Sequence, residues 1–337
     1  MRLLFGLVII SVVFFSCNNG DKIPDVSMIK VPLTTQRFEK DLFILDTNHF
    51  TANLYQLIAK DPGFGENYLT TILGTDPKWS NDSIASYVKG FVTSYRTLYD
   101  TSQQLFKDFT PYENEIKQGL QFVKHYFPAY KIPSKIITYI GPVDGYGDIV
   151  SDDALIVGLH LHLGKNYSLY KSELVQQTYP EYMSRRFEPN TIATNALKNI
   201  VDDIYPEKLE DKTLVQQMIE KGKRLYVLSK VLPHTEESQL IGYTAVQLKD
   251  CYANEQKIWD MFVQNNLLQT IDDNIIKNYI GEAPKTQELG DESPGNIGAF
   301  AGWQIVKKYM SKNDGVNLQK LMTTDNDTIL QEAKYKP

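Results

Sequence analysis

Cysteine and histidine are both scarce in this chain of 337 residues. It contains two cysteines, Cys17 and Cys251, and five histidines. If Cys17 is modified, as proposed below, no disulfide can form within the chain, so a hydrophobic core must hold the fold. Cys251 has no histidine near it in sequence and lies in an amphipathic stretch, where we expect a small buried residue. No histidine occurs between His162 and His234, which limits where a zinc site could be built.

An excess of positive charge is also absent. The chain has 35 basic and 41 acidic residues, which gives a net charge of -6, and its lysines and arginines form no basic stripe. Such a balance argues against a nucleic-acid partner. Serine-nucleophile motifs, phosphate-binding loops and dinucleotide fingerprints are missing as well. We therefore expect neither a nucleic acid nor a cofactor.

One long apolar run is present, at the N-terminus. Arg2 precedes the apolar segment Leu3–Phe15, which ends at Ser16 and Cys17. A run of this length is typical of a secretory signal and is short for a permanent membrane span. A small residue followed directly by cysteine is typical of a bacterial lipoprotein signal, so we predict that Cys17 carries a lipid. The alternative is a plain signal peptide with an incidental cysteine.

The signal predicts how the chain is divided. Residues 1–16 form the signal peptide, residues 17–30 form a polar tether behind the lipid, and residues 31–337 form a single domain. Within that domain, 31–130 is a helical N-terminal part and 131–337 a second part that contains the sheet. The expected location is the cell envelope, with the lipid in the outer membrane. The sequence leaves open whether the protein is on the periplasmic or the surface face of that membrane.

Apolar periodicity predicts a largely helical protein. The two stretches rich in β-branched and aromatic residues, Lys135–Ile140 and Ala154–Leu163, are the convincing strands. Helical spacing is found over 83–99, 111–127, 190–205, 212–232, 235–262 and 294–310. The expected fold class is α+β, mostly helical around one small sheet of three or four strands.

The segment that follows the predicted sheet has the spacing of a zinc-peptidase helix without its chemistry. Zinc peptidases carry His-Glu-x-x-His, with the glutamate as general base. The corresponding positions here are Asn195, Ala196 and Asn199, and Lys221 stands where a third, acidic ligand is expected. Asparagine is a poor zinc ligand, and a cation opposes metal binding. A shift of one residue would bring Glu220 into place but could not restore the histidines, so we expect a degenerate site that is not an enzyme.

Polar positions of this segment have two readings. Asn195, Lys198 and Asn199 either line a retained cleft that binds a peptide or glycan, or are ordinary polar positions on a helix surface.

His160 and His162 form the other candidate metal site. On a strand, alternate residues share a face, so both rings could reach one ion. Alternatively, both rings face solvent or pack against a neighbouring helix.

Glycines recur in the last predicted helix. Gly295, Gly298 and Gly302 precede or adjoin Trp303. Glycine inside a helix costs about 1 kcal/mol relative to alanine, so these positions predict close approach by another element or by a ligand.

Three stretches together resemble the gliding motility lipoprotein GldB family, which is similar in turn to predicted zinc-dependent, thermolysin-like proteases. The matching stretches are Ile132–Tyr139, Glu220–Tyr226 with Leu232-Pro233, and Ser293–Val306. The resemblance implies a degenerate peptidase-like (gluzincin-like) architecture and envelope protein partners.

Three functions remain open at this point. The first is a non-catalytic, lipid-anchored component of a cell-envelope machine for gliding motility or linked secretion, with a binding or scaffolding role. The second is an active zinc metalloprotein that uses His160 and His162. The third is a lipoprotein that binds peptides or glycans in the empty cleft.

Overall fold

The computed structural model describes residues 23–337, so Cys17 and the predicted signal peptide lie outside the described residues. A mixed sheet has the strand order β1-β2-β4-β3. Strand β1 (Thr34–Arg37) pairs in parallel with β2 (Lys135–Tyr139), and β2 pairs in parallel with β4 (Ala154–Gly158). The short β3 (Ile149–Val150) closes the edge in the antiparallel direction. Strands β2 and β4 are almost wholly buried, which explains why their sequences are rich in apolar and β-branched residues.

The N-terminal part supplies both a strand and helices to this sheet. Because β1 pairs with β2, residues 31–130 and the rest of the chain share one sheet. Helix α1 contacts β2, and α6 packs against the later helix α9. The helices of this part are α1 (Phe38–Phe43), α2 (Phe50–Ile58), α3 (Pro62–Asn67), α4 (Asn81–Ser94), α5 (Arg96–Leu105) and α6 (Thr110–Tyr126).

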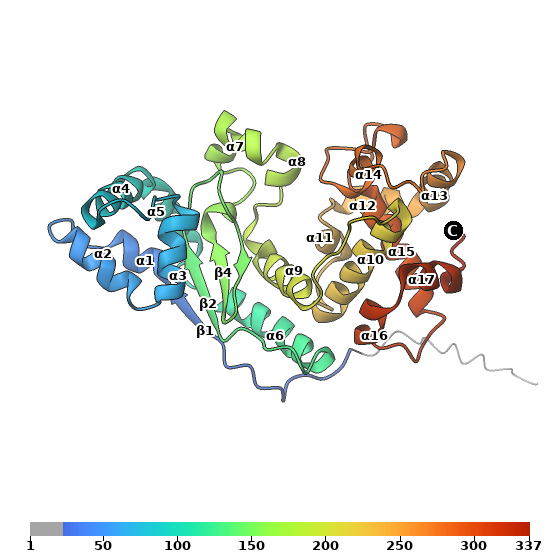
Figure 1. Cartoon of the computed structure of the whole chain (residues 1–337), viewed down its shortest axis with the longest axis horizontal. Coiled ribbons are helices and arrows are strands. Elements are labelled where there is room, and N and C mark those ends of the chain that lie inside the picture. The colour runs from blue at the N-terminus through green and yellow to red at the C-terminus, as the bar shows by residue number, and fades with distance from the viewer. Residues whose placement is uncertain (1–22) are drawn as a thin grey trace, which may run out of the picture.

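After the sheet the chain is helical to its end. Figure 1 shows α9 running between the sheet and a second group of helices that extends from α10 to α17. These helices are α7 (Glu173–Thr178), α8 (Glu181–Ser184), α9 (Ile192–Ile204), α10 (Leu214–Val231), α11 (Glu237–Ile241), α12 (Ala245–Ala253), α13 (Glu255–Gln264), α14 (Asp273–Ile280), α15 (Ile297–Met310), α16 (Leu318–Thr323) and α17 (Asn326–Ala333). The predicted class, α+β and mostly helical, is confirmed.

One predicted helix is wrong. The apolar spacing over 235–262 predicts a single helix, but the structure has α11, α12 and α13 in its place. Gly242 follows α11 with φ 80°, a left-handed conformation that glycine adopts without steric cost and that ends the helix. Thr244 then caps α12 with its side chain, so a new helix direction begins two residues later.

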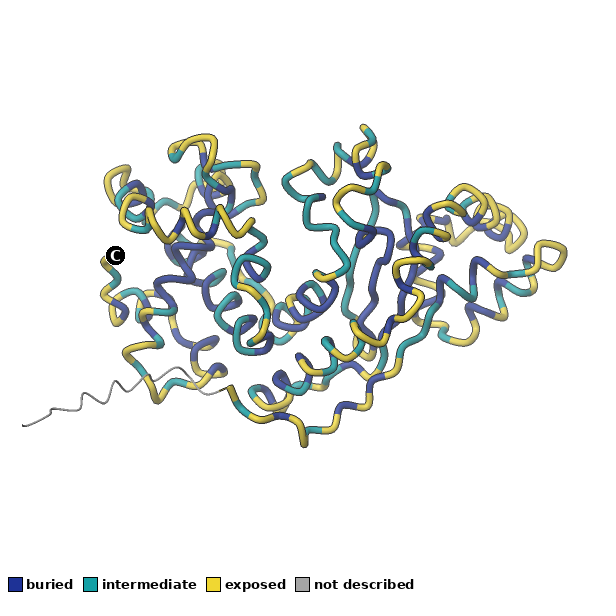
Figure 2. The backbone as a smooth tube through the Cα atoms, turned by 180° about the vertical axis from the view of Figure 1, so that it is seen from behind, coloured by how far each residue is buried: buried dark blue, intermediate teal, exposed yellow. Residues whose placement is uncertain are grey.

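Helices α10 and α15 cross in the core and make the most extensive contact between two elements of the described chain. Figure 2 shows buried residues in the interior of the sheet region and of the α10–α17 group, and exposed residues on the outer helices. Trp303 and Phe300 on α15 are fully buried, and so is Met218 on α10. Among residues 23–337, no helix combines the length and the apolar character that crossing a bilayer requires.

Candidate functional site

Helix α9 forms the base of a cleft. A single turn at Pro189–Thr191 leads into it, and proline suits such a position because its missing N–H has no partner there. Ile192, Ala196 and Ile200 recur at helical spacing and are buried. Lys198 lies on the side of the helix away from this apolar stripe. In Figure 1, α9 lies between α7 and α8 on one side and α11 and α14 on the other.

The first cavity of the cleft has a volume of about 330 Å³. Its walls come from the segment before α9, from α9 itself, from α11 and from Glu282. Asn195 and Lys198 both line this cavity, together with the adjacent cations Arg185 and Arg186. Two of the three predicted polar positions therefore line a cleft, whereas Asn199 lines neither this cavity nor the one next to it.

The second cavity has a volume of about 150 Å³ and adjoins the first. The two share Lys198, Leu240, Ile241 and Glu282, so they form one cleft with two compartments. The walls of the second compartment are mixed: apolar side chains such as Val201, Leu225 and Leu228 stand beside charged ones such as Asp202 and Arg224. Lys198 stands where the two compartments join.

Asn195 and Asn199 hold a buried aspartate instead of a metal. The Nδ2 atom of Asn195 donates to Asp148 Oδ2 at 3.1 Å, and that of Asn199 donates to the Asp148 backbone oxygen at 2.9 Å. His162 Nε2 lies 2.9 Å from the same Oδ2 atom. These four residues form a polar cluster that fastens the chain before β3 to α9. Asp148 comes from 47 residues before Asn195, and sequence analysis missed it.

The cluster contains a buried ion pair. The side chains of His162 and Asp148 are 2% and 6% exposed. Burial is the largest single effect on Asp148 and raises its pKa, but His162 and the Asn195 amide together outweigh it and lower the pKa of the carboxyl. Burial likewise opposes the charge on His162, yet Asp148 and the Glu188 carbonyl raise the pKa of the imidazole overall. Both pKa shifts therefore favour the charged form of the pair.

His160 and His162 do not share a strand face, and this part of the prediction is wrong. Strand β4 ends at Gly158, and His160 lies in the single 3-10 turn Leu159–Leu161. His160 Nδ1 accepts the Gly141 N–H at 3.1 Å, while Nε2 lies 3.0 Å from the Tyr146 carbonyl oxygen. Each ring is thus bonded on both nitrogens to different partners.

Burial makes His160 sensitive to acid. Desolvation lowers the pKa of His160 to about 4, against an ordinary value of 6.5. A histidine with a lowered folded pKa stabilises the fold above 6.5, and this stability is lost as the pH falls towards 4. We expect urea unfolding to show about 2.5 kcal/mol less stability from this group at pH 4.5 than at pH 7.5.

The matched comparison is His160→Gln, which keeps an acceptor and a donor. His162 titrates in the opposite sense, since its raised pKa adds stability at low pH, but it is unchanged in both proteins. The difference between wild type and variant therefore isolates His160. Equal pH dependence in the two proteins would contradict this account.

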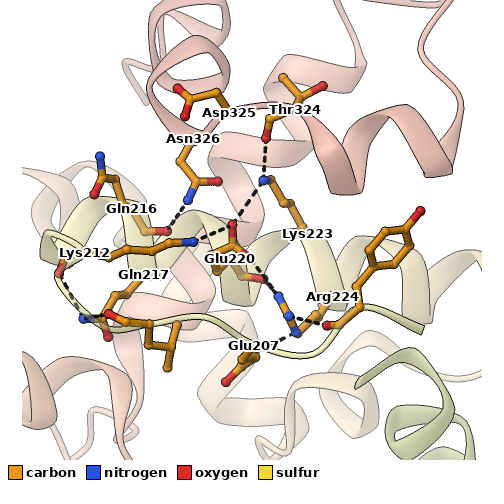
Figure 3. A network of polar contacts seen from close by, with 12 residues as sticks. Glu207, Lys212, Gln216, Gln217, Glu220, Lys223, Arg224, Thr324, Asp325 and Asn326 are labelled. Atoms are coloured by element: carbon orange, nitrogen blue, oxygen red, sulfur yellow. Dashed lines mark hydrogen bonds and ion pairs between the residues drawn. The ribbon is translucent and has the colours of Figure 1, made fainter. Parts of the chain in front are cut away.

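The remaining degenerate positions have other partners. Ala196 is buried against the core, and Lys221 pairs with Glu207 at 2.8 Å. Glu220 is held between Lys223 and Arg224, as Figure 3 shows. The structure therefore brings Asn195 and Asn199 to one aspartate, and places Lys221 in the second compartment with its own ion pair.

Glycines of α15 permit a close helix crossing. A Cβ atom at Gly302 would overlap the Met218 carbonyl, and one at Gly222 would overlap the Gly302 carbonyl. A Cβ atom at Gly298 would lie 2.9 Å from the Tyr279 carbonyl oxygen. These glycines serve packing, and Trp303 is buried beside them.

The donor set of the site is poor for zinc. Within residues 23–337, no group of three or more histidine, cysteine, aspartate or glutamate side chains is arranged to hold a metal ion. Near α9, His162 and Asp148 are already paired with each other, and the amides of Asn195 and Asn199 are bonded to Asp148.

A comparison with protein families matches residues 19–337 to the family described as gliding motility protein GldB. This chain belongs to the GldB family. The match covers the sheet, α9 and the cleft, so these are features of a GldB-family domain. No curated protein and no solved structure matches the chain. Membership associates the protein with the cell envelope and with the gliding machinery.

Proposed function

We propose that this GldB-family protein is a non-catalytic lipoprotein, anchored in the outer membrane through Cys17. It acts as a binding or scaffolding component of the gliding machinery or of secretion linked to it. The observation that carries the proposal is the use of Asn195 and Asn199 to hold Asp148, because a zinc peptidase needs metal ligands and a base at these positions. A peptidase-like shell without the chemistry is part of this proposal.

A binding role is favoured over a purely structural one because the space above α9 is open. A filled cleft is expected if the shell served only as a spacer, whereas the first compartment alone offers about 330 Å³. This volume lies at the lower end of the range for small-ligand sites.

The proposal is tested with Cys17→Ser in cells that lack their own copy of the protein. We expect the wild-type chain to fractionate with membranes and to restore gliding on agar. The variant should move largely to the soluble fraction of the envelope and fail to restore gliding, because a lipid chain supplies the anchoring free energy. Purified variant with an unchanged thermal unfolding curve serves as the control for folding.

Two results would count against the proposal. Full gliding by a soluble Cys17→Ser protein would remove the need for an anchor. One zinc ion per chain, lost on His160→Ala and accompanied by peptide hydrolysis, would support the alternative metalloprotein. Asn195→Ala should leave hydrolysis undetectable, as in the wild type.

A further inference from the structure

The charges of the cleft are not balanced inside it. The first compartment is lined by three cations, Arg185, Arg186 and Lys198, and by two acidic residues, Glu188 and Glu282. Glu282 is paired with Arg186 at 3.0 Å. The Glu188 carboxylate instead accepts the Lys165 backbone N–H at 3.2 Å. Both acidic groups thus already have partners, and Glu282 neutralises Arg186 within the compartment.

Arg185 and Lys198 are left without a carboxylate. Arg185 donates to Gln247 Oε1 at 3.0 Å, which fixes its guanidinium without neutralising it. No ion pair or hydrogen bond holds the Lys198 amine within the described part of the chain, 23–337. Burial and then Arg186 lower the pKa of Lys198, and the nearby carboxylates of Glu282 and Asp202 offset this only in part. The side chain is nevertheless solvent-exposed by area, so the amine is surrounded by cleft walls and still reachable.

The second compartment is suited to a different chemical group than the first. Leu225, Leu228 and Ile280 are among the apolar residues that line it, and Lys198 marks its entrance. The charged residues that also line it, Asp202, Glu207, Lys221 and Arg224, pair with one another, which leaves the two leucines and Ile280 as the surface that an apolar group can cover. A ligand that fills both compartments therefore combines an anionic group at Lys198 with an apolar group next to it.

We propose that the cleft binds a peptide through a carboxylate that pairs with Lys198, with the neighbouring apolar side chain in the second compartment. The inference deepens the binding role proposed above and rests on it. A C-terminal carboxylate and an acidic side chain share this chemistry. A peptide fits better than a lone anion because a lone anion would leave the apolar side chains of the second compartment uncovered.

Four synthetic peptides test the inference by isothermal titration with the purified chain from residue 23. They are N-acetyl-Ala-Ala-Leu with a free carboxylate, its C-terminal amide, N-acetyl-Ala-Glu-Leu-amide, and N-acetyl-Ala-Ala-Gly with a free carboxylate. We expect the first to bind at least about tenfold more tightly than its amide, because a charge-assisted pair is lost. The glycine peptide should also bind about tenfold more weakly than the leucine peptide, since it leaves the apolar side chains of the second compartment uncovered.

Lys198→Met should lower affinity for the free carboxylate about tenfold or more and leave the amide unaffected. Lys198→Arg, which keeps the charge, should retain most of the binding and keeps the test valid if the methionine variant folds poorly. Lys249→Met is the matched control, because Lys249 is an exposed lysine on α12 that lines none of the cleft. Tight binding of the glutamate peptide would identify an acidic side chain as the source and uphold the inference.

Equal affinity for the acid and the amide, or no binding of any peptide, would overturn the inference. Such a failure is distinguishable from failure of the proposed function. Membrane anchoring and gliding, measured with Cys17→Ser, do not depend on which peptide the purified protein binds. Full gliding by a soluble Cys17→Ser protein, together with tight binding of the carboxylate peptide, would overturn the proposed function alone.

Discussion

Gly302→Ala will unfold in urea with a free energy lower than that of the wild type by about 3 kcal/mol or more. A Cβ atom at this position would overlap the carbonyl oxygen and carbon of Met218, which belong to the backbone of α10. Backbone atoms within a helix cannot move aside as a side chain can, so α10 and α15 must separate. Far-ultraviolet circular dichroism during urea titration measures the loss.

Helices α10 and α15 each place a glycine against the backbone of the other, which is why we expect a large loss of stability. A Cβ atom at Gly222 on α10 would overlap the Gly302 carbonyl on α15. Separating the helices also loosens the packing around the fully buried Trp303. A loss of this size is a substantial fraction of the stability of an ordinary domain, about 5–15 kcal/mol.

Gly90→Ala is the matched control. Gly90 lies inside α4, and a Cβ atom there would meet no atom within 4 Å. Removing a glycine from an exposed helix interior should raise stability by up to about 1 kcal/mol. If Gly302→Ala and Gly90→Ala changed stability in the same direction, the described crossing of α10 and α15 would be wrong.

The sequence predicted this crossing only in part. Glycine at Gly298 and Gly302 indicates that something approaches α15, since the residue has a cost in a helix and needs a reason. It does not indicate what approaches. The partner, Met218 on α10, is far away in sequence and is identified only by tertiary packing.

Strand β1 shows where local patterns fail for the fold. Thr34–Arg37 is four residues long, has no apolar alternation and pairs with residues about a hundred positions later. Parallel pairing over such a distance leaves no local signal in the chain. Longer elements such as α9 and α10 have many periodic positions and were predicted to within a few residues.

For the candidate site, the helix was predicted and its contacts were not. The spacing of Asn195 and Asn199 places both on one face of a helix, which follows from helical geometry alone. Their shared partner, Asp148, lies in a loop before the short β3, where no periodicity operates. Arg185 and Arg186, which stand just before α9, offered a signal that sequence analysis passed over, since adjacent cations beside a polar helix indicate an anionic ligand.

Glu220→Gln is expected to have the second large effect, a loss of about 3–5 kcal/mol at neutral pH. Glu220 Oε1 lies 3.2 Å from the Lys223 amine, and Oε2 accepts from Arg224 at 2.9 Å. The Lys223 side chain is 2% exposed and also donates to the Thr324 carbonyl (Figure 3). Loss of the carboxylate leaves this buried cation without its counter-charge.

The same group predicts how the loss depends on pH. Burial alone raises the pKa of Glu220, but Lys223, Asn326 and Arg224 outweigh it and lower the pKa to about 2, against an ordinary 4.5. A carboxyl with a lowered folded pKa stabilises the fold above 4.5, and this stability is lost as the pH falls towards 2. The gap in urea stability between wild type and Glu220→Gln should therefore narrow by about 2 kcal/mol between pH 6 and pH 3.

Two further variants separate charge pairing from packing. Glu207→Gln removes a carboxylate that is 24% exposed, so it should cost less than about 1 kcal/mol. Adding Lys223→Met to Glu220→Gln removes the uncompensated cation, and the double variant should be more stable than Glu220→Gln alone. A double variant that is less stable than the single one would mean that Lys223 contributes mainly through Thr324, and that Glu220 is not the group that makes its burial tolerable.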